Sequence, residues 1–170
     1  ARVGAIINPV NTMLTPSEII YVVNDCGAKT IICSEDKIQA LEDIRKHTQI
    51  RNIISFGRKS DEIQSFSSII AKNFSIDKQP NVSPKDLSTI AYTSGTTGHP
   101  KGAMQSHEAV ILNGSMTSQL HMRGPDDIIV SALPCPHVYA NVLMTGMMMF
   151  GTKLILHKSF EVDTIFESIK

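Results

Sequence analysis

A short run of apolar and β-branched residues, Thr30 to Cys33, lies between two segments with helical periodicity. Runs of this kind are typical of strands that are covered on both faces. A second such run, Ile50 to Phe56, is expected to form the next strand. Because strands that alternate with helices favour parallel pairing, the sequence predicts an α/β fold with mixed, largely parallel sheet layers and flanking helices.

Helices are expected before and after the first of these strands. Thr15 can serve as an N-cap, Pro16 suits the first helical position, and Glu18 can complete a capping box. This combination predicts a helix over 16–26. Ser34 is expected to cap the second helix. The buried face of that helix would carry three residues at helical spacing: Ile38, Leu41 and Ile44.

The segment 73–85 is polar and contains two prolines, so it is predicted to be a linker between subregions 1–72 and 86–170. After it, strands are expected at 87–92, 128–131 and 152–157, and helices at 106–120 and after a proline-bracketed turn at 134–137. The chain begins in an apolar segment and stops within an amphipathic one. We therefore expect residues 1–170 to be a single fragment of a larger domain.

Composition argues against several classes of partner. Lys plus Arg equal Asp plus Glu, 16 against 16, so no net field favours nucleic acid or an anionic membrane surface. The longest apolar stretch, 142–150, is well short of the roughly 20 residues that span a bilayer, so no integral membrane segment is expected. Three cysteines without a CxxC pair, and no secretory signal at the start, favour a cytoplasmic location.

The segment 92–102 combines four serine or threonine side chains, three glycines and one lysine directly after a predicted strand. Glycine allows the backbone to approach an anion closely, so that N–H groups can converge on it. Hydroxyl groups add donors, and Lys101 adds a mobile positive charge. This segment is therefore predicted to be a loop that binds phosphate groups.

Other interpretations of these residues fit the sequence less well. The segment does not match a P-loop, because Pro100 and Gly102 stand where that motif requires glycine and a magnesium-binding hydroxyl. A plain surface turn is disfavoured, because such turns rarely place a lysine beyond a proline directly after an apolar strand. A zinc site at Cys135 and His137 lacks further ligands. A P-loop-like ATPase or kinase and a non-catalytic nucleotide-binding module stay open. Four further histidines are expected to be solvated: His47, His99, His121 and His157.

The string Tyr92 to Gly102, YTSGTTGHPKG, resembles the phosphate-loop signature of the adenylate-forming superfamily. That superfamily includes acyl-CoA synthetases, firefly luciferase and the adenylation domains of nonribosomal peptide synthetases. The resemblance extends over 1–35, 104–107 and 133–137, and it is weakest between 57 and 85. It implies that the chain is part of the large N-terminal AMP-binding domain, without the C-terminal domain.

The resemblance also implies roles for individual residues. Lys101 and His137 would be the catalytic candidates, with His137 near the substrate carboxylate. Pro136 and Ala140 depart from the family pattern, in which an aromatic or bulky residue and a glycine are usual. Thr97 would contribute to the magnesium of Mg–ATP. The residues implied to contact the ATP phosphates are Thr93, Ser94, Gly95, Thr96, Thr97, Gly98 and Lys101, and those beside the acyl pocket are Val138, Tyr139 and Asn141.

The implied reaction has two steps and uses ATP, Mg²⁺ and coenzyme A. A carboxylate attacks the α-phosphate of ATP to give an acyl-adenylate and pyrophosphate, and the coenzyme A thiol then displaces AMP. The Met-rich segment and the general resemblance favour a medium- or long-chain fatty acid over an amino acid or aryl acid. The superfamily's later signatures would follow Lys170, so these residues alone are expected to be inactive, and oligomerisation stays open.

Overall fold

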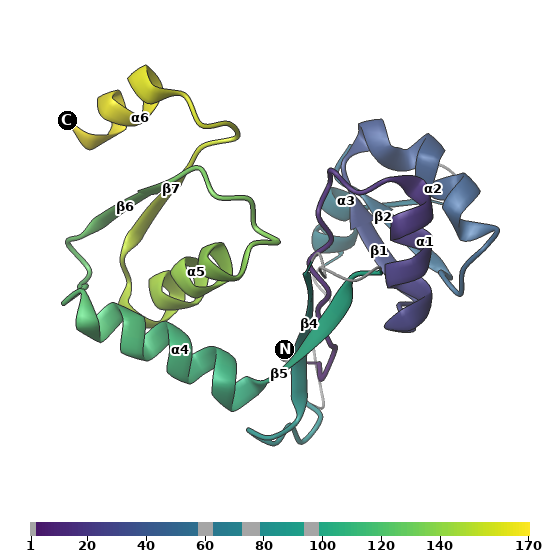
Figure 1. The fold of residues 1–170 in the computed structure, drawn as a ribbon, viewed down its shortest axis with the longest axis horizontal. Coiled ribbons are helices and arrows are strands. Elements are labelled where there is room, and N and C mark those ends of the chain that lie inside the picture. Colours follow the sequence, from purple (N-terminus) through teal and green to yellow (C-terminus); the bar gives the residue numbers. More distant parts are fainter. Residues whose placement is uncertain (1–2, 58–62, 73–78, 94–98) are drawn as a thin grey trace.

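The computed structural model describes residues 3–57, 63–72, 79–93 and 99–170. In Figure 1, a group of helices around a small sheet lies on one side, and the elements of the C-terminal half lie on the other. A two-stranded ribbon formed by β4 (Leu87–Thr93) and β5 (Lys101–Ser106) stands between the two groups.

The N-terminal half is built on a three-stranded parallel sheet with the order β1-β2-β3. Its strands are β1 (Thr30–Cys33), β2 (Asn52–Ser55) and β3 (Ile63–Ser65), and its helices are α1 (Pro16–Asp25), α2 (Ile38–Arg45) and α3 (Phe66–Ile70). A cluster of buried aliphatic side chains joins α1 and α2 to the sheet; its members include Val23, Ile38, Leu41, Ile44, Ile53 and Ile63. The predicted parallel pairing is thus confirmed.

Helix α1 begins as the sequence predicts. The Thr15 hydroxyl accepts a hydrogen bond from the Glu18 backbone N–H, and the Glu18 carboxylate accepts one from the Thr15 N–H at 2.7 Å. This second contact lowers the pKa of Glu18. Ser34 behaves differently from the prediction, because its hydroxyl donates to the Asp36 carboxylate rather than capping α2. A short 3₁₀ turn, Glu35–Lys37, therefore precedes α2.

The ribbon consists of β4 (Leu87–Thr93) and β5 (Lys101–Ser106), which pair antiparallel. On the other side of β4, Ile7 forms a parallel bridge to Thr89. The Ile7 N–H donates to the Ser88 carbonyl at 2.9 Å, and the Ile7 carbonyl accepts from the Ile90 N–H at 2.9 Å. The helix predicted at 106–120 is confirmed, since a helix spans His107–Leu120, but the sequence did not predict the strand β5 that precedes it.

The C-terminal half contains α4 (His107–Leu120), β6 (Ile128–Ser131), α5 (Val138–Phe150), β7 (Lys153–Leu156) and α6 (Val162–Ile169). Strands β6 and β7 pair in parallel, and α4 packs along α5 (Figure 1). Within the described ranges, no helix is both long and apolar enough to cross a membrane.

The segment 79–85 contains neither helix nor strand, in keeping with the predicted linker, whose residues 73–78 lie outside the described part of the chain. Pro84, within this segment, and Asp86, directly after it, nevertheless support α4. The His107 N–H donates to the Asp86 carbonyl at 3.1 Å, and the Glu108 N–H donates to the Pro84 carbonyl at 2.8 Å. These bonds satisfy backbone donors that the first turn of a helix leaves free.

Candidate functional site

Two residues of the predicted phosphate-binding segment lie opposite each other at one end of the ribbon. Thr93 ends β4, Lys101 begins β5, and the two are paired in the strand register. Both are exposed, and the side chain of Lys101 has no hydrogen bond or ion pair to any residue of the described ranges. A hydroxyl group and an uncompensated ammonium group therefore flank the connection between the strands. The remaining predicted phosphate contacts lie outside the described residues: Ser94, Gly95, Thr96, Thr97 and Gly98.

The strand that leads into this connection is fixed by Tyr92. The Tyr92 hydroxyl donates a hydrogen bond to the carboxylate of Asp25, the last residue of α1. Burial, this hydrogen bond and the nearby negative charge all raise the pKa of Tyr92, so the phenol stays protonated as the donor.

Gly102 serves a packing purpose that the sequence pattern did not reveal. A Cβ atom at this position would lie 2.8 Å from Ile90 Cγ2 and 3.0 Å from Tyr92 Cζ. Gly102 pairs with Tyr92 across the ribbon, so the absence of a side chain leaves room for the tyrosine ring. The glycine was predicted to lie in the loop, whereas it belongs to β5 and permits close packing.

His99 lies beside α1, the helix that Tyr92 also contacts. Its ring stacks on the ring of Tyr21 in α1, with centroids 4.4 Å apart and planes inclined by 16°. His99 is exposed, as expected, but it is packed against an aromatic neighbour. His157 departs further from the prediction of a solvated side chain, because it is half-buried and its Nε2 lies 2.9 Å from Ser168 Oγ.

The second group of predicted residues gathers at the start of α5. His137 is the N-cap, and its Nδ1 accepts a hydrogen bond from the Tyr139 N–H at 3.2 Å. In a neutral imidazole that accepts at Nδ1, the proton resides on Nε2. The exposed His137 ring therefore presents an Nε2–H donor at the positive end of a helix, where an anion is favoured.

The other acyl-site candidates lie in the same two turns of α5. Val138 and Tyr139 are exposed, and Asn141 is half-buried. The backbone carbonyl of Asn141 accepts a hydrogen bond from Thr145 Oγ1 at 2.9 Å. Ala140 is buried, with 3% of its surface exposed. The departure from glycine at Ala140 thus affects the packing of α5 against its neighbours, while the exposed surface is formed by Val138 and Tyr139.

The structure pairs Thr93 with Lys101 and places the acyl-site candidates together in α5, but it does not join these two sets of residues. Throughout the part of the chain that the structure describes, no hydrogen bond, ion pair or ring contact connects Thr93 or Lys101 with the residues of α5. Figure 1 shows the two groups on separate elements, the ribbon and α5. A ligand that contacts both would have to extend between them.

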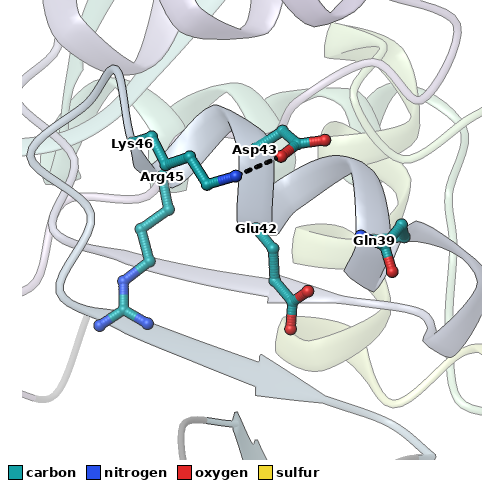
Figure 2. A pocket seen from close by; sticks show the side chains of 5 residues that line it. All are labelled: Gln39, Glu42, Asp43, Arg45 and Lys46. Atoms are coloured by element: carbon teal, nitrogen blue, oxygen red, sulfur yellow. Dashed lines mark hydrogen bonds and ion pairs between the residues drawn. The ribbon is translucent and has the colours of Figure 1, made fainter.

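Two hollows on the surface of the described residues lie away from these candidates. One lies beside α2 and is lined by charged and polar side chains, including Lys46 and Asp43, whose Nζ and Oδ1 atoms are 2.7 Å apart (Figure 2). This hydrogen bond lowers the pKa of Asp43 and raises that of Lys46. The other hollow is mainly apolar and includes Pro84, Ile111 and Leu112. Neither contains a predicted site residue.

Comparisons with known proteins fit this arrangement. The family model "AMP-binding enzyme" matches residues 1–170. The chain is 28% identical to an indoleacetate–CoA ligase of Aromatoleum aromaticum, covering 100% of this chain and 34% of that protein. It is 28% identical to the long-chain-fatty-acid–CoA ligase FadD13 of Mycobacterium tuberculosis, covering 99% of this chain and 33% of that protein.

Among solved structures, ATP-bound MatB from Rhodopseudomonas palustris matches with a TM-score of 0.78 and 28% identity, covering 98% of this chain and 33% of that chain. The chain thus spans about a third of the length of the relatives that it matches. The family match runs from the first residue to the last and includes the ribbon, its glycine-rich connection and the start of α5. The chain belongs to the AMP-binding enzyme family.

Proposed function

We propose that the full-length protein is an AMP-forming acid–CoA ligase and that the connection between β4 and β5 holds the phosphates of Mg–ATP. The observation that carries the proposal is the pairing of Thr93 with an unpartnered Lys101 at the two ends of that connection, in a chain of the AMP-binding family. The ATP-bound state of the similar MatB structure supports the choice of nucleotide.

In the first step, a substrate carboxylate attacks the α-phosphate of ATP and pyrophosphate leaves. The leaving group gains negative charge as its bond to the α-phosphate breaks. The Lys101 ammonium group has no protein anion to neutralise it within the described ranges, so it is available to stabilise that charge. The Thr93 hydroxyl would add a hydrogen bond at the same end of the ribbon.

Magnesium would enter with the nucleotide. Over the described residues, no three His, Cys, Asp or Glu side chains gather to hold a metal ion. Oxygen atoms suit Mg²⁺, and the phosphates supply most of them. We propose that Thr97 contributes a hydroxyl ligand to the magnesium of Mg–ATP.

His137 would act on the acid. Its Nε2–H can donate to the carboxylate, which would hold one oxygen and leave the other to attack phosphorus. Val138, Tyr139 and Asn141 would line the start of the acyl site. In the second step, the thiol of coenzyme A attacks the acyl carbon and AMP leaves.

We propose a medium- or long-chain fatty acid as the substrate, which agrees with the similarity to FadD13. An aryl acid is the second candidate, because the similar protein of A. aromaticum is an indoleacetate–CoA ligase. The free thiols of Cys26, Cys33 and Cys135 accord with a cytoplasmic location.

The test uses the full-length protein with Mg–ATP, coenzyme A and matched panels of fatty, aryl and amino acids. We expect AMP, pyrophosphate and a thioester to form with one class of acid only. Formation of ADP, or nucleotide turnover that is independent of the acid, would contradict the proposal. The isolated residues 1–170, assayed alongside, are expected to show no turnover, since they span about a third of the relatives.

A further inference from the structure

Both ends of the glycine-rich connection contact a single helix. On the incoming side, Tyr92 donates a hydrogen bond to Asp25, and on the outgoing side, His99 stacks on Tyr21. Tyr21 and Asp25 are one helical turn apart in α1, so their side chains lie on the same face. In Figure 1, α1 lies beside the end of the β4–β5 ribbon.

Helix α1 is a firm support for these contacts. Val22 and Val23, which lie between the two anchoring residues, are only 1% and 2% exposed. The capping box at Thr15 fixes the beginning of the helix. A helix that is held by the core and by its cap can impose its position on flanking groups, whereas a surface loop cannot.

The absence of a side chain at Gly102 lets Tyr92 reach this helix. Gly102 faces the tyrosine ring across the ribbon, and a Cβ atom there would be 3.2 Å from the tyrosine hydroxyl oxygen. Any larger residue would have to displace the ring that reaches Asp25. The last glycine of the motif is thus required by the contact between Tyr92 and α1.

We propose that α1 positions the phosphate-binding segment, with Tyr21 and Asp25 holding His99 and Tyr92 in place. This inference rests on the proposed function, because it assumes that the segment binds the phosphates of ATP. Contacts that hold Tyr92 and His99 in place before ATP binds lower the entropic cost of ordering these two residues on binding. Tyr21, Asp25, Tyr92 and His99 are therefore positioning residues.

The test compares substitutions that remove a contact with substitutions that keep it, in the full-length protein. Tyr21→Ala removes the stacking partner, while Tyr21→Phe keeps the ring. We expect Tyr21→Ala to raise KM for ATP by about threefold to tenfold, as the loss of one aromatic pair implies, and Tyr21→Phe to stay near the wild type. KM for the acid and KM for coenzyme A should each change less than about twofold, because binding of these two substrates does not depend on the phosphate-binding segment.

His99→Ala and Tyr92→Phe should shift KM for ATP in the same direction. His121→Ala is the matched control, because His121 is exposed and its ring makes no hydrogen bond and stacks on no other ring within the described ranges. Equal increases in the KM values of all three substrates, or a lower melting temperature with KM for ATP unchanged, would overturn the inference and assign α1 a purely structural role.

Binding of Mg–ATP without acid, measured by calorimetry, separates this inference from the proposed function. If the wild type binds ATP but forms no acyl-CoA with any acid, and Tyr21→Ala still weakens binding while Tyr21→Phe does not, the inference stands and the ligase proposal fails. If the wild type is an active ligase and Tyr21→Ala binds ATP normally, the ligase proposal stands and the inference fails.

Discussion

Gly146 of α5 lies so close to Ser118 of α4 that a Cβ atom at the glycine would be 2.4 Å from the serine Oγ. Gly146→Ala should therefore destabilise the protein by about 1–3 kcal/mol, as overpacking of a close helix contact does. Thermal unfolding of the full-length protein would measure this loss. Gly124→Ala is the control, because its new Cβ would approach nothing closer than Asp127 Oδ2 at 4.0 Å.

The same contact allows a rescue experiment. The Ser118 hydroxyl is buried and has no hydrogen-bond partner within the described ranges, while its Cβ would lie 3.8 Å from the new methyl group. Ser118→Ala combined with Gly146→Ala should therefore recover most of the lost stability. A double variant no more stable than Gly146→Ala would show that backbone contacts, rather than the hydroxyl, limit this helix pair.

Lys101→Ala should reduce kcat for acid-dependent pyrophosphate release by a factor on the order of 10²–10³, as expected when a preorganised charge is removed from a developing anion. Lys101→Arg should retain part of the activity because the positive charge stays. Lys158→Ala is the control, since Lys158 is also exposed and has no ion pair in the described part of the chain. Unchanged kcat in Lys101→Ala would remove the lysine from the proposed mechanism.

His137 combines an N-cap with an exposed Nε2–H donor, and two substitutions separate these roles. His137→Asn can still cap α5 and should keep the melting temperature, while kcat/KM for the acid falls by roughly tenfold or more. His137→Ala should lose activity and also about 1 kcal/mol of stability. Equal melting temperatures for the two variants would show that the cap contributes nothing measurable.

Cysteine labelling should follow burial. Burial and the nearby charge of Asp36 raise the pKa of the Cys33 thiol, so less of the reactive thiolate is present at a given pH. Cys135 is exposed and should react with iodoacetamide at pH 8 at least ~10 times faster than Cys33. Peptide mass spectrometry over time would give both rates, with denatured protein as the reference. Fast labelling of native Cys33 would contradict its burial.

Features encoded in neighbouring residues could be predicted from the sequence. The capping box at Thr15 and Glu18 involves groups within one helical turn, and the strand at Thr30–Cys33 is a continuous apolar run. The spacing of Ile38, Leu41 and Ile44 likewise identified the buried face of α2. In each case, residues that are close in the sequence determine the cap, the strand or the buried helix face.

Features that depend on distant or atypical residues could not be predicted. Strand β5 begins with Lys101 and Gly102, which have the composition of a loop, and β3 contains only Ile63–Ser65. The hydrogen bond between Tyr92 and Asp25 joins positions separated by 67 in the sequence. No periodic pattern connects these two residues, so this part of the candidate site emerged only from the tertiary structure.

The bridge at Ile7 has a consequence for handling this protein. Through its backbone N–H and carbonyl, Ile7 occupies the side of β4 that β5 leaves free. Trimming the chain to begin after Pro9 would leave that side unpaired, and an open strand edge recruits strands from other molecules. Shortened versions should therefore self-associate and precipitate, even though the trimmed residues lie far along the sequence from the ribbon.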